Sequence, residues 1–189
     1  MPIPVAWGYS KAGVSSFIIT AELENNIPLD VALQESKITD IRMKTALIKT
    51  IAFFARSLHT AGYCHKDFYT GHILIKKDGE NKLCTNTVFL IDLQRIQHLK
   101  LIKRRWFVKD LAQLNFSAQF PTVSVRDKIA FLHEYFSVSK LTAAQRKCMK
   151  KIDLKTQKIY AHIPKVLRRK NIHSWDEIPH AEEKVKHSV

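Results

Sequence analysis

The fold is decided by the stretch Tyr63-Cys64-His65-Lys66-Asp67-Phe68-Tyr69-Thr70-Gly71-His72-Ile73-Leu74-Ile75. It follows a long amphipathic helical pattern, and its last four residues are typical of the start of a strand. Three titratable side chains, those of His65, Asp67 and His72, lie in the short loop between these two elements. Catalytic groups are commonly placed on loops that rigid elements hold. We therefore predict that this loop carries the chemistry of the protein.

The helical pattern before the loop runs from Asp40 to Ala61. Its apolar residues recur at helical spacing, so one stripe faces the core. The stripe consists of Leu47, Ile51, Phe54, Ala55 and Leu58. Gly62 is a natural C-terminal stop for this helix. The helix therefore leads the chain directly into the loop.

A second acidic residue, Asp92, follows an apolar run 25 positions after Asp67. Residues 72–75 and 88–93 are predicted strands on either side of a polar turn over residues 76–87, and their pairing would bring Asp92 toward Asp67. The loop spacing His-x-Asp-x-x-x-x-His is close to that of the kinase catalytic loop. Kinases also place a metal-binding Asp at the end of a later strand. Together the two signals indicate a phosphotransferase.

The N-terminal part predicts two short strands, Pro4–Tyr9 and Ser16–Leu23. Within the second, the run Phe17-Ile18-Ile19-Thr20 is β-branched and aromatic, which is typical of a buried strand. Pro28 opens a short helix, since a proline is tolerated at the first helical position.

Three helices are predicted after the strand pair. Residues 110–116 form the first, and capping boxes at Ser124 and Thr142 open the other two. We expect the last helix to end at Pro164. The segment 165–189 then predicts a basic, loosely held tail, with Trp175 and Ile178 as its docking residues.

The composition predicts one domain, because 189 residues with 46% hydrophobic content are enough for a core. No apolar run approaches the roughly 18–20 residues that cross a bilayer, and the N-terminus lacks a secretory signal, so a cytoplasmic location is expected. Three cysteines at wide spacings predict reduced thiols, not a disulfide framework or a zinc site. For Cys64, beside the loop, a small buried side chain is favoured over a nucleophile.

The net charge of +14 and the pI near 9.8 favour polyanionic partners. Nucleic acid, an anionic membrane surface and a phosphorylated substrate all fit such a charge. The run Lys103-Arg104-Arg105-Trp106-Phe107 would suit nucleic acid. However, the sequence contains no helix-turn-helix, zinc-finger or aromatic RNA-binding motif. Nucleic acid is therefore an unlikely partner.

Four stretches together resemble the bacterial lipopolysaccharide inner-core kinases, above all the heptose kinases, with the Kdo kinases as near relatives. Residues 16–23 resemble the strand that enters the hinge between kinase lobes, and residues 65–74 resemble the catalytic loop. Residues 91–95, Ile-Asp-Leu-Gln-Arg, stand where ordinary kinases carry Asp-Phe-Gly, and residues 105–114 resemble the helix that follows. The resemblance covers Pro4 to Phe136.

The resemblance implies an α+β, protein-kinase-like fold and transfer of phosphate from ATP to a core heptose hydroxyl. It implies that Asp67 is the catalytic residue, and that Asp92 holds Mg²⁺ with His72 as a candidate second ligand. Glu22 and Leu23 would contact the nucleotide at the hinge, and His65 and Asp110 would support the loop. The implied partners are the lipid A-core acceptor and the anionic surface of the inner membrane, at which the protein would be peripheral on the cytoplasmic side.

Two departures from the kinase pattern shape this expectation. His72 stands where protein kinases carry a metal-binding Asn, and an imidazole is a poor ligand for Mg²⁺. The heptose kinases resemble this chain in having His there, so the resemblance implies heptose and not Kdo as acceptor. Only about 15 residues precede the hinge-like stretch, with Gly8, Gly13 and Lys11 among them. We therefore expect residues 1–23 to be a remnant of the N-terminal lobe, 24–164 to be the C-terminal lobe and 165–189 to be the tail. A catalytically inactive remnant that acts as a binding module is the alternative.

Overall fold

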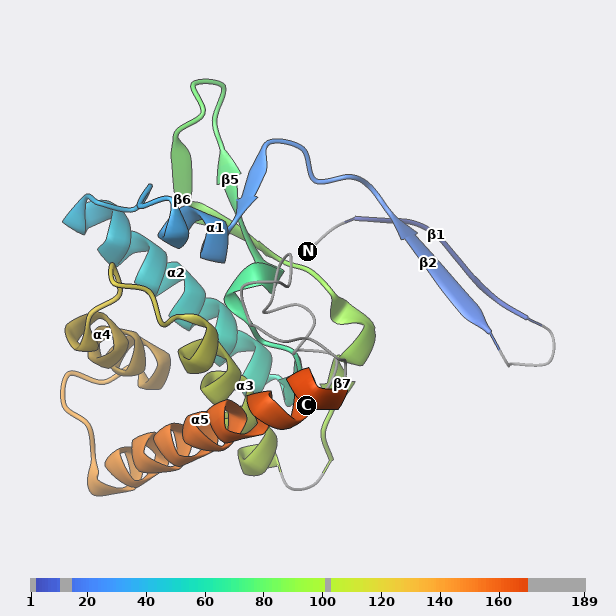
Figure 1. The fold of residues 1–189 in the computed structure, drawn as a ribbon. Coiled ribbons are helices and arrows are strands. Elements are labelled where there is room, and N and C mark those ends of the chain that lie inside the picture. Colours follow the sequence, from blue (N-terminus) through green and yellow to red (C-terminus); the bar gives the residue numbers. More distant parts are fainter. Residues whose placement is uncertain (1–2, 11–14, 101–102, 170–189) are drawn as a thin grey trace.

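The computed structural model describes residues 3–10, 15–100 and 103–169 (Figure 1). Its body combines helices with a three-stranded antiparallel sheet. The sheet has the order β3 (Asn26–Pro28), β5 (Ile73–Lys77), β6 (Leu83–Leu90). The expected α+β class is confirmed.

The long helix α2 (Ile41–Thr60) forms where the sequence predicts it. The Asp40 side chain caps its N-terminus by accepting hydrogen bonds from the backbone N–H groups of Arg42 (2.6 Å) and Met43 (3.0 Å). At the other end Gly62 has φ of 85°, a left-handed conformation that glycine adopts without steric penalty. The predicted stripe faces inward, and the core also buries Ala52 and His59, which the stripe does not include.

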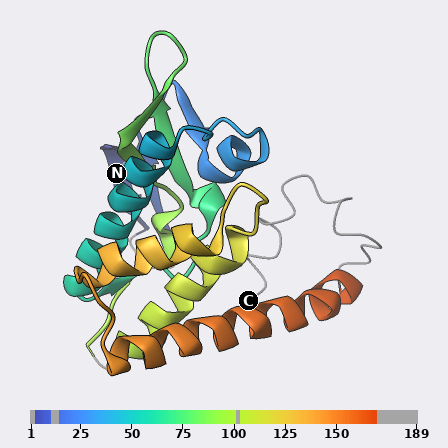
Figure 2. The same ribbon diagram turned by 90° about the vertical axis from the view of Figure 1, so that its left-hand side faces the viewer.

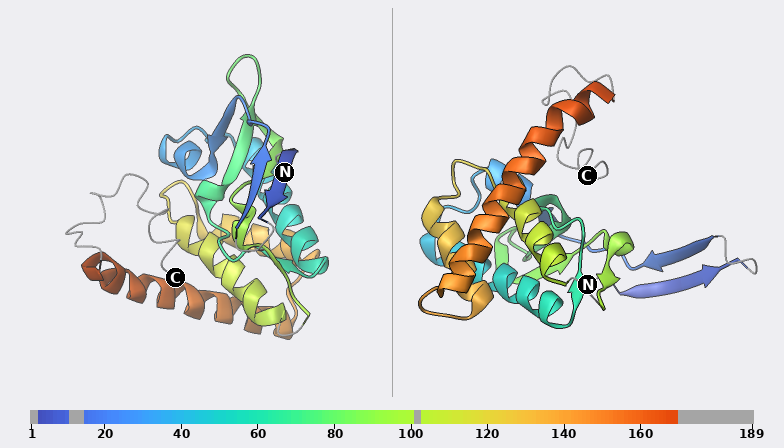
Figure 3. Two further views of the ribbon diagram at one scale, coloured as in Figure 1. Left: turned by 90° about the vertical axis from the view of Figure 1, so that its right-hand side faces the viewer. Right: turned by 90° about the horizontal axis from the view of Figure 1, so that it is seen from below.

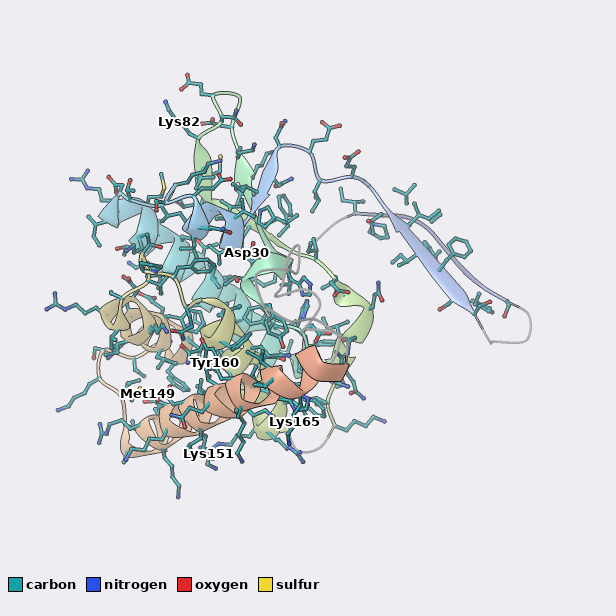
Figure 4. The ribbon with its side chains drawn as sticks, in the orientation of Figure 1. Asp30, Lys82, Met149, Lys151, Tyr160 and Lys165 are labelled. Carbon is teal, nitrogen blue, oxygen red and sulfur yellow. The ribbon has the colours of Figure 1, made fainter. Side chains whose placement is uncertain are left out.

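The hairpin of β5 and β6 is tighter than the sequence indicates. The predicted turn reached residue 87, whereas β6 already begins at Leu83. The Asp78 carboxylate accepts hydrogen bonds from the backbone N–H groups of Glu80 and Lys82, both at 2.9 Å, and so fixes a short turn. Lys82 lies at the tip of this hairpin (Figure 4). The strand β6 ends at Leu90, so Asp92 lies just beyond it.

Four further helices surround α2 and the sheet. They are α1 (Leu29–Gln34), α3 (Lys103–Ser117), α4 (Val125–Phe136) and α5 (Ala143–Arg169). Helix α4 packs against α2 and α5 packs against α3, and these two pairs make the most extensive helix contacts. In Figure 2, α5 crosses the lower side of the body beneath α3. The short strands β4 (Tyr63–Cys64) and β7 (Gln97–His98) pair beside α3.

Two hydrophobic clusters form the core of the body. One lies between α1, α2 and the sheet, and the other lies between α3, α4 and α5. Phe68 is buried in the first cluster and Tyr69 in the second. Because these two residues directly follow Asp67, the loop is anchored in both hydrophobic clusters immediately after this carboxylate.

Two helix boundaries differ from the predicted ones. The helix predicted over 110–116 begins at Lys103, so the basic run joins its first turns. The end predicted at Pro164 is wrong, because α5 continues through this proline to Arg169. A proline removes one backbone hydrogen bond and bends a helix without having to end it. The turn before this proline is anchored, since Ile159 is buried and Ile163 packs against the second cluster.

The predicted tail therefore begins inside a helix. Lys165 belongs to α5 and is exposed (Figure 4). The expected docking of Trp175 and Ile178 lies outside the described residues, which end at residue 169.

The N-terminal hairpin of β1 (Pro4–Tyr9) and β2 (Ser16–Thr20) projects away from the body (Figure 3). Both strands form as predicted, although β2 stops at Thr20, three residues before the predicted end. The prediction that residues 17–20 are a buried strand is wrong, because every residue of β2 is exposed. The reason is that β1 and β2 pair only with each other in the described part of the chain. Gly8 allows the Phe17 ring to cross β1, since a Cβ there would lie 2.6 Å from that ring.

None of the helices in the described ranges is long and apolar enough to cross a membrane.

Candidate active site

Asp110 of α3 binds the backbone of the loop that is predicted to carry the chemistry. Its carboxylate accepts hydrogen bonds from the backbone N–H groups of His65 (2.7 Å) and Lys66 (2.9 Å). Lys66 has φ of 70°, a conformation that a non-glycine residue adopts only when its surroundings impose it. Asp110 is fully buried. It therefore fixes the backbone immediately before Asp67.

Two more residues of α3 bind the same loop. Gln113 Nε2 donates to the carbonyl of Lys66 at 2.8 Å, and Ser117 Oγ accepts from the backbone N–H of Thr70 at 2.9 Å. Both side chains are buried. Asp110, Gln113 and Ser117 are three and four residues apart, so they share one face of the helix. Sequence reasoning missed Gln113 and Ser117, although this polar spacing was a signal that could have found them.

Asp67 is fully buried, and its carboxylate faces Arg95. Nη1 of Arg95 lies 2.9 Å from each carboxylate oxygen and donates a hydrogen bond to Oδ1. Oδ2 accepts no hydrogen bond of good geometry within the described ranges. Sequence reasoning assigned no role to Arg95, although it ends the quoted segment 91–95.

His72 joins Asp67 to Asp92. Its Nδ1 lies 2.8 Å from the backbone carbonyl of Asp67, and its Nε2 lies 3.4 Å from Oδ2 of Asp92. A carbonyl only accepts hydrogen bonds, so Nδ1 carries a proton and Nε2 faces the carboxylate. Asp92 has φ of 55° and follows β6 directly. The structure therefore brings together Asp67, His72 and Asp92, three residues that the sequence singled out.

His65 links the loop to the segment that carries Asp92. Its Nε2 donates to the carbonyl of Ile91 at 3.0 Å, and the backbone N–H of Ile91 donates to the carbonyl of His72, also at 3.0 Å. Burial lowers the pKa of His65 below its ordinary value, so its ring is neutral at physiological pH. The His65 ring therefore stabilises the backbone of the two segments that carry Asp67 and Asp92.

A buried chain of side chains continues behind Asp110. His59 Nε2 lies 3.2 Å from Oδ2 of Asp110, and His59 Nδ1 lies 2.7 Å from the hydroxyl of Tyr135 on α4. The His59 ring stacks on Phe107 with a centroid separation of 4.3 Å. Burial raises the pKa of Tyr135, so its hydroxyl stays protonated. The loop support thus extends through α2 and α4, which the sequence did not indicate.

The profile of the lipopolysaccharide kinase (Kdo/WaaP) family matches residues 1–135. The chain belongs to this family. It is 36% identical over 131 residues to the lipopolysaccharide core heptose(I) kinase WaaP of Pseudomonas aeruginosa, an alignment that covers 68% of this chain and 49% of the relative. The corresponding kinase of Escherichia coli K12 is 30% identical over 161 residues, which is 80% of this chain and 61% of the relative. The chain thus spans about half to three fifths of the length of these curated relatives.

A solved structure shares the fold. It is titled "WaaP in complex with acyl carrier protein", and it superposes with a TM-score of 0.67 and 30% sequence identity over 84% of this chain and 69% of that one. The resemblance drawn from the sequence, and with it the protein-kinase-like fold expected of this family, is confirmed.

Glu22 and Leu23, the expected nucleotide contacts of this family member, lie on the segment between β2 and β3. Glu22 is exposed and Leu23 is half-buried. This segment joins the projecting hairpin to the body (Figure 1). None of the hydrogen bonds or ion pairs found in the described ranges connects either residue to Asp67 or Asp92. The role of Glu22 and Leu23 as nucleotide contacts therefore stays a prediction.

The donor set predicted for a cation consists of Asp92 and His72. The described part of the chain holds no cluster of three or more His, Cys, Asp or Glu side chains suited to a metal ion. Mg²⁺ is usually held by one or two carboxylates together with phosphate oxygens and water, so Asp92 alone is an adequate protein ligand. The residues present therefore fit Mg²⁺.

Cys64 is a buried residue of β4 and not a nucleophile of this site. Its side chain is fully buried, and burial raises the pKa of its thiol, which keeps it in the unreactive protonated form. All three cysteines are free thiols, as the sequence predicted.

A cavity of about 390 Å³ lies among α1, α2, α3, α4 and α5, and its lining does not include Asp67 or Asp92. Its lining is mainly aliphatic and includes Leu33, Leu47, Ile51, Leu114 and Leu132. Such a cavity suits an apolar ligand and not a nucleotide.

Proposed function

We propose that this chain carries the catalytic carboxylates of an ATP-dependent kinase that phosphorylates a heptose hydroxyl of the lipopolysaccharide core. The observation that carries the proposal is the joining of Asp67 and Asp92 through His72. Phosphoryl transfer depends chiefly on alignment and charge neutralisation, and a rigid mount for two carboxylates serves both needs.

In this proposal Asp67 orients the acceptor hydroxyl and accepts its proton. The backbone on either side of Asp67 is fixed by Asp110 and by the burial of Phe68 and Tyr69. A catalytic carboxylate must hold its position to within a fraction of an ångström, which such anchoring supports.

Asp92 is the proposed ligand for Mg²⁺, and Nε2 of His72 is the candidate second donor. Bound Mg²⁺ supplies neutralisation of the charge on the nucleotide phosphates. His72 also contacts the Asp67 carbonyl and lies beside the Asp92 carboxylate, so it is placed between the two acidic residues. Glu22 and Leu23 are the proposed nucleotide contacts at the hinge.

The acceptor is proposed to be the lipid A-core, reached at the cytoplasmic surface of the inner membrane. Support comes from the net charge of +14 and from exposed cations along α5, among them Lys150, Lys151 and Lys165 (Figure 4). Each basic residue near an anionic surface contributes about 1 kcal/mol of binding. A Kdo hydroxyl is the alternative acceptor within the same family.

Acyl carrier protein is a further proposed partner, since a solved relative was found in complex with it. The aliphatic cavity among α1, α2, α3, α4 and α5 suits an acyl chain. The competing function is binding without turnover, which the N-terminal hairpin favours, because the cross-strand pair Trp7 and Ile18 is largely exposed there.

The test is transfer of labelled phosphate from ATP to core lipopolysaccharide that lacks the heptose phosphate. Asp67→Asn is expected to abolish transfer, whereas Glu80→Gln, an exposed carboxylate on the β5–β6 turn, is expected to leave it unchanged. Transfer by Asp67→Asn at the wild-type rate would exclude Asp67 as the catalytic residue. Absence of transfer by the wild-type chain would favour the binding function.

A further inference from the structure

The ion pair of Arg95 with Asp67 is asymmetric in its exposure. The Asp67 side chain is 1% exposed and the Arg95 side chain is 40% exposed. The guanidinium therefore forms the solvent side of the pair, and the carboxylate is enclosed by protein elsewhere. A group that approaches the carboxylate from solvent meets the guanidinium first.

Other cations gather near this pair. Lys66 Nζ lies 4.8 Å and Lys109 Nζ lies 5.5 Å from the centroid of the Trp106 ring. Burial, followed by repulsion from Arg95, lowers the pKa of Lys109. Asp67 and Asp110 offset part of this positive charge, since both attract the Lys109 ammonium. Three cations thus lie near Asp67, and Arg95 is the one that contacts its carboxylate.

The guanidinium of Arg95 is able to serve two anions in turn. It presents five N–H donors in a planar fork, which binds phosphate as well as carboxylate. In the pair with Asp67 only Nη1 comes within hydrogen-bonding distance of the carboxylate. Its partial exposure leaves the remaining donors accessible from solvent.

We propose that Arg95 is a phosphate-binding residue that is shared between Asp67 and the terminal phosphate of a polyphosphate ligand. Without the ligand, Arg95 pairs with Asp67 and covers it. A bound phosphate competes for the guanidinium and uncovers the carboxylate, so that Asp67 becomes available to a hydroxyl when phosphate is present. This inference rests on the proposed phosphoryl-transfer function and adds to it a residue that couples phosphate binding to access to Asp67.

Competition for one guanidinium predicts whether each substitution strengthens or weakens phosphate binding. Removing the charge of Asp67 should strengthen phosphate binding, because the competitor is lost. Removing Arg95 should weaken binding. The two changes should also be coupled, because the gain from neutralising Asp67 depends on Arg95.

The experiment measures binding of inorganic tripolyphosphate to the full chain by calorimetry, with EDTA present so that cations at Asp92 play no part. The variants are Arg95→Ala, Asp67→Asn and the double variant. Arg42→Ala, at an exposed arginine in the first turn of α2, is the control for loss of one positive charge. Circular dichroism and thermal unfolding confirm that each variant is folded, and Arg95→Gln replaces Arg95→Ala if the latter unfolds.

We expect Arg95→Ala to weaken binding about tenfold, the factor for one charge-assisted hydrogen bond, and Arg42→Ala to change it much less. We expect Asp67→Asn to tighten binding several-fold, and to tighten it less when Arg95 is absent. Equal affinities for Arg95→Ala and Arg42→Ala would overturn the proposal. An equal gain in tripolyphosphate affinity from Asp67→Asn with and without Arg95 would show that Asp67 and phosphate do not compete for Arg95.

A second measurement covers the case in which Asp67→Asn does not fold. The Nε–Hε NMR signal of Arg95 in the wild-type chain, assigned by its loss in Arg95→Gln, should shift on addition of tripolyphosphate. An unchanged signal at saturating tripolyphosphate would refute the proposal. Neither measurement needs an acceptor or turnover, so failure of this inference is distinguishable from failure of the proposed kinase activity.

Discussion

The N-terminal hairpin and the loop at residues 63–75 differ in which kinds of side chain they bury. In the hairpin, Trp7 is 74% exposed and Ile18 is 66% exposed, although both are large apolar residues. In the loop, His65 and Asp67 are fully buried, although both are polar. From hydrophobicity alone one would have predicted buried side chains in the hairpin and exposed side chains in the loop.

The difference lies in what packs against each region. The loop lies on α3, where Asp110, Gln113 and Ser117 satisfy its backbone groups, so polar residues are buried without losing hydrogen bonds. The described residues provide no third strand or helix to cover the hairpin. A two-stranded hairpin by itself is marginally stable in water. Burial in this chain is therefore decided by the partner an element finds.

The largest effect is expected from removing the support of the loop. Asp110→Ala leaves the backbone N–H groups of His65 and Lys66 without their buried acceptor. We expect the free energy of unfolding to fall by about 3–5 kcal/mol, as for a broken buried network. Urea unfolding measures it, with Asp153→Ala on the exposed side of α5 as the control. A loss no larger than the control's would show that α3 does not hold the loop.

A smaller effect is expected at the far end of the same support. Ser117→Ala removes the buried acceptor of the Thr70 backbone N–H, which should lower the free energy of unfolding by about 1–3 kcal/mol. Ser57→Ala, at an exposed position of α2, is the matched control. If both serine variants unfold at the same urea concentration, water has replaced the Ser117 contact.

A pH effect is expected from His65. Burial lowers its pKa from the ordinary 6.5, so the unfolded chain binds a proton more readily than the folded chain just below this pH. The free energy of unfolding should then fall as the pH decreases from 6.5 toward the folded pKa, by at most about 1.4 kcal/mol per pH unit. His65→Gln should remove this slope, and the exposed His98→Gln should keep it. The same slope in wild type and in His65→Gln between pH 6.5 and 5 would mean that His65 does not titrate differently on folding.

The smallest effect is expected in the hairpin. Ile18→Thr changes a side chain that is 66% exposed, so the free energy of unfolding of the body should change by no more than about 0.5 kcal/mol. Ile75→Thr, a fully buried change of the same type in β5, should destabilise by several times as much. Similar losses for the two variants would indicate that the hairpin packs against the body in solution.

Several features of the fold were predictable because their causes are local. The Asp40 cap and Gly62 bound α2, and Ser124 with Asp127 forms the capping box that starts α4. The loop at 63–75 was also predictable, since its residue spacing matches a family pattern. Contacts within a few residues determine the helix ends, and the loop was found from the spacing of its residues alone.

Other features depend on residues that are far apart in the sequence. Helix α5 continues past Pro164, and the turn before this proline packs in the second cluster through Ile159 and Ile163. The exposure of β2 follows from the absence of a covering element in the described chain, which no pattern in residues 16–20 could indicate. These outcomes depend on packing between distant segments.

Asp67, His72 and Asp92 could be identified as candidate site residues from the sequence, because their side-chain chemistry and spacing match a kinase site. Only the tertiary structure decided that Arg95 covers Asp67 and that α3 holds the loop. Arg95 lies 28 residues from Asp67 in the sequence, and Asp110 lies 45 residues from His65. Closing such separations requires that the core first bring the elements together, and that step is a property of the whole fold.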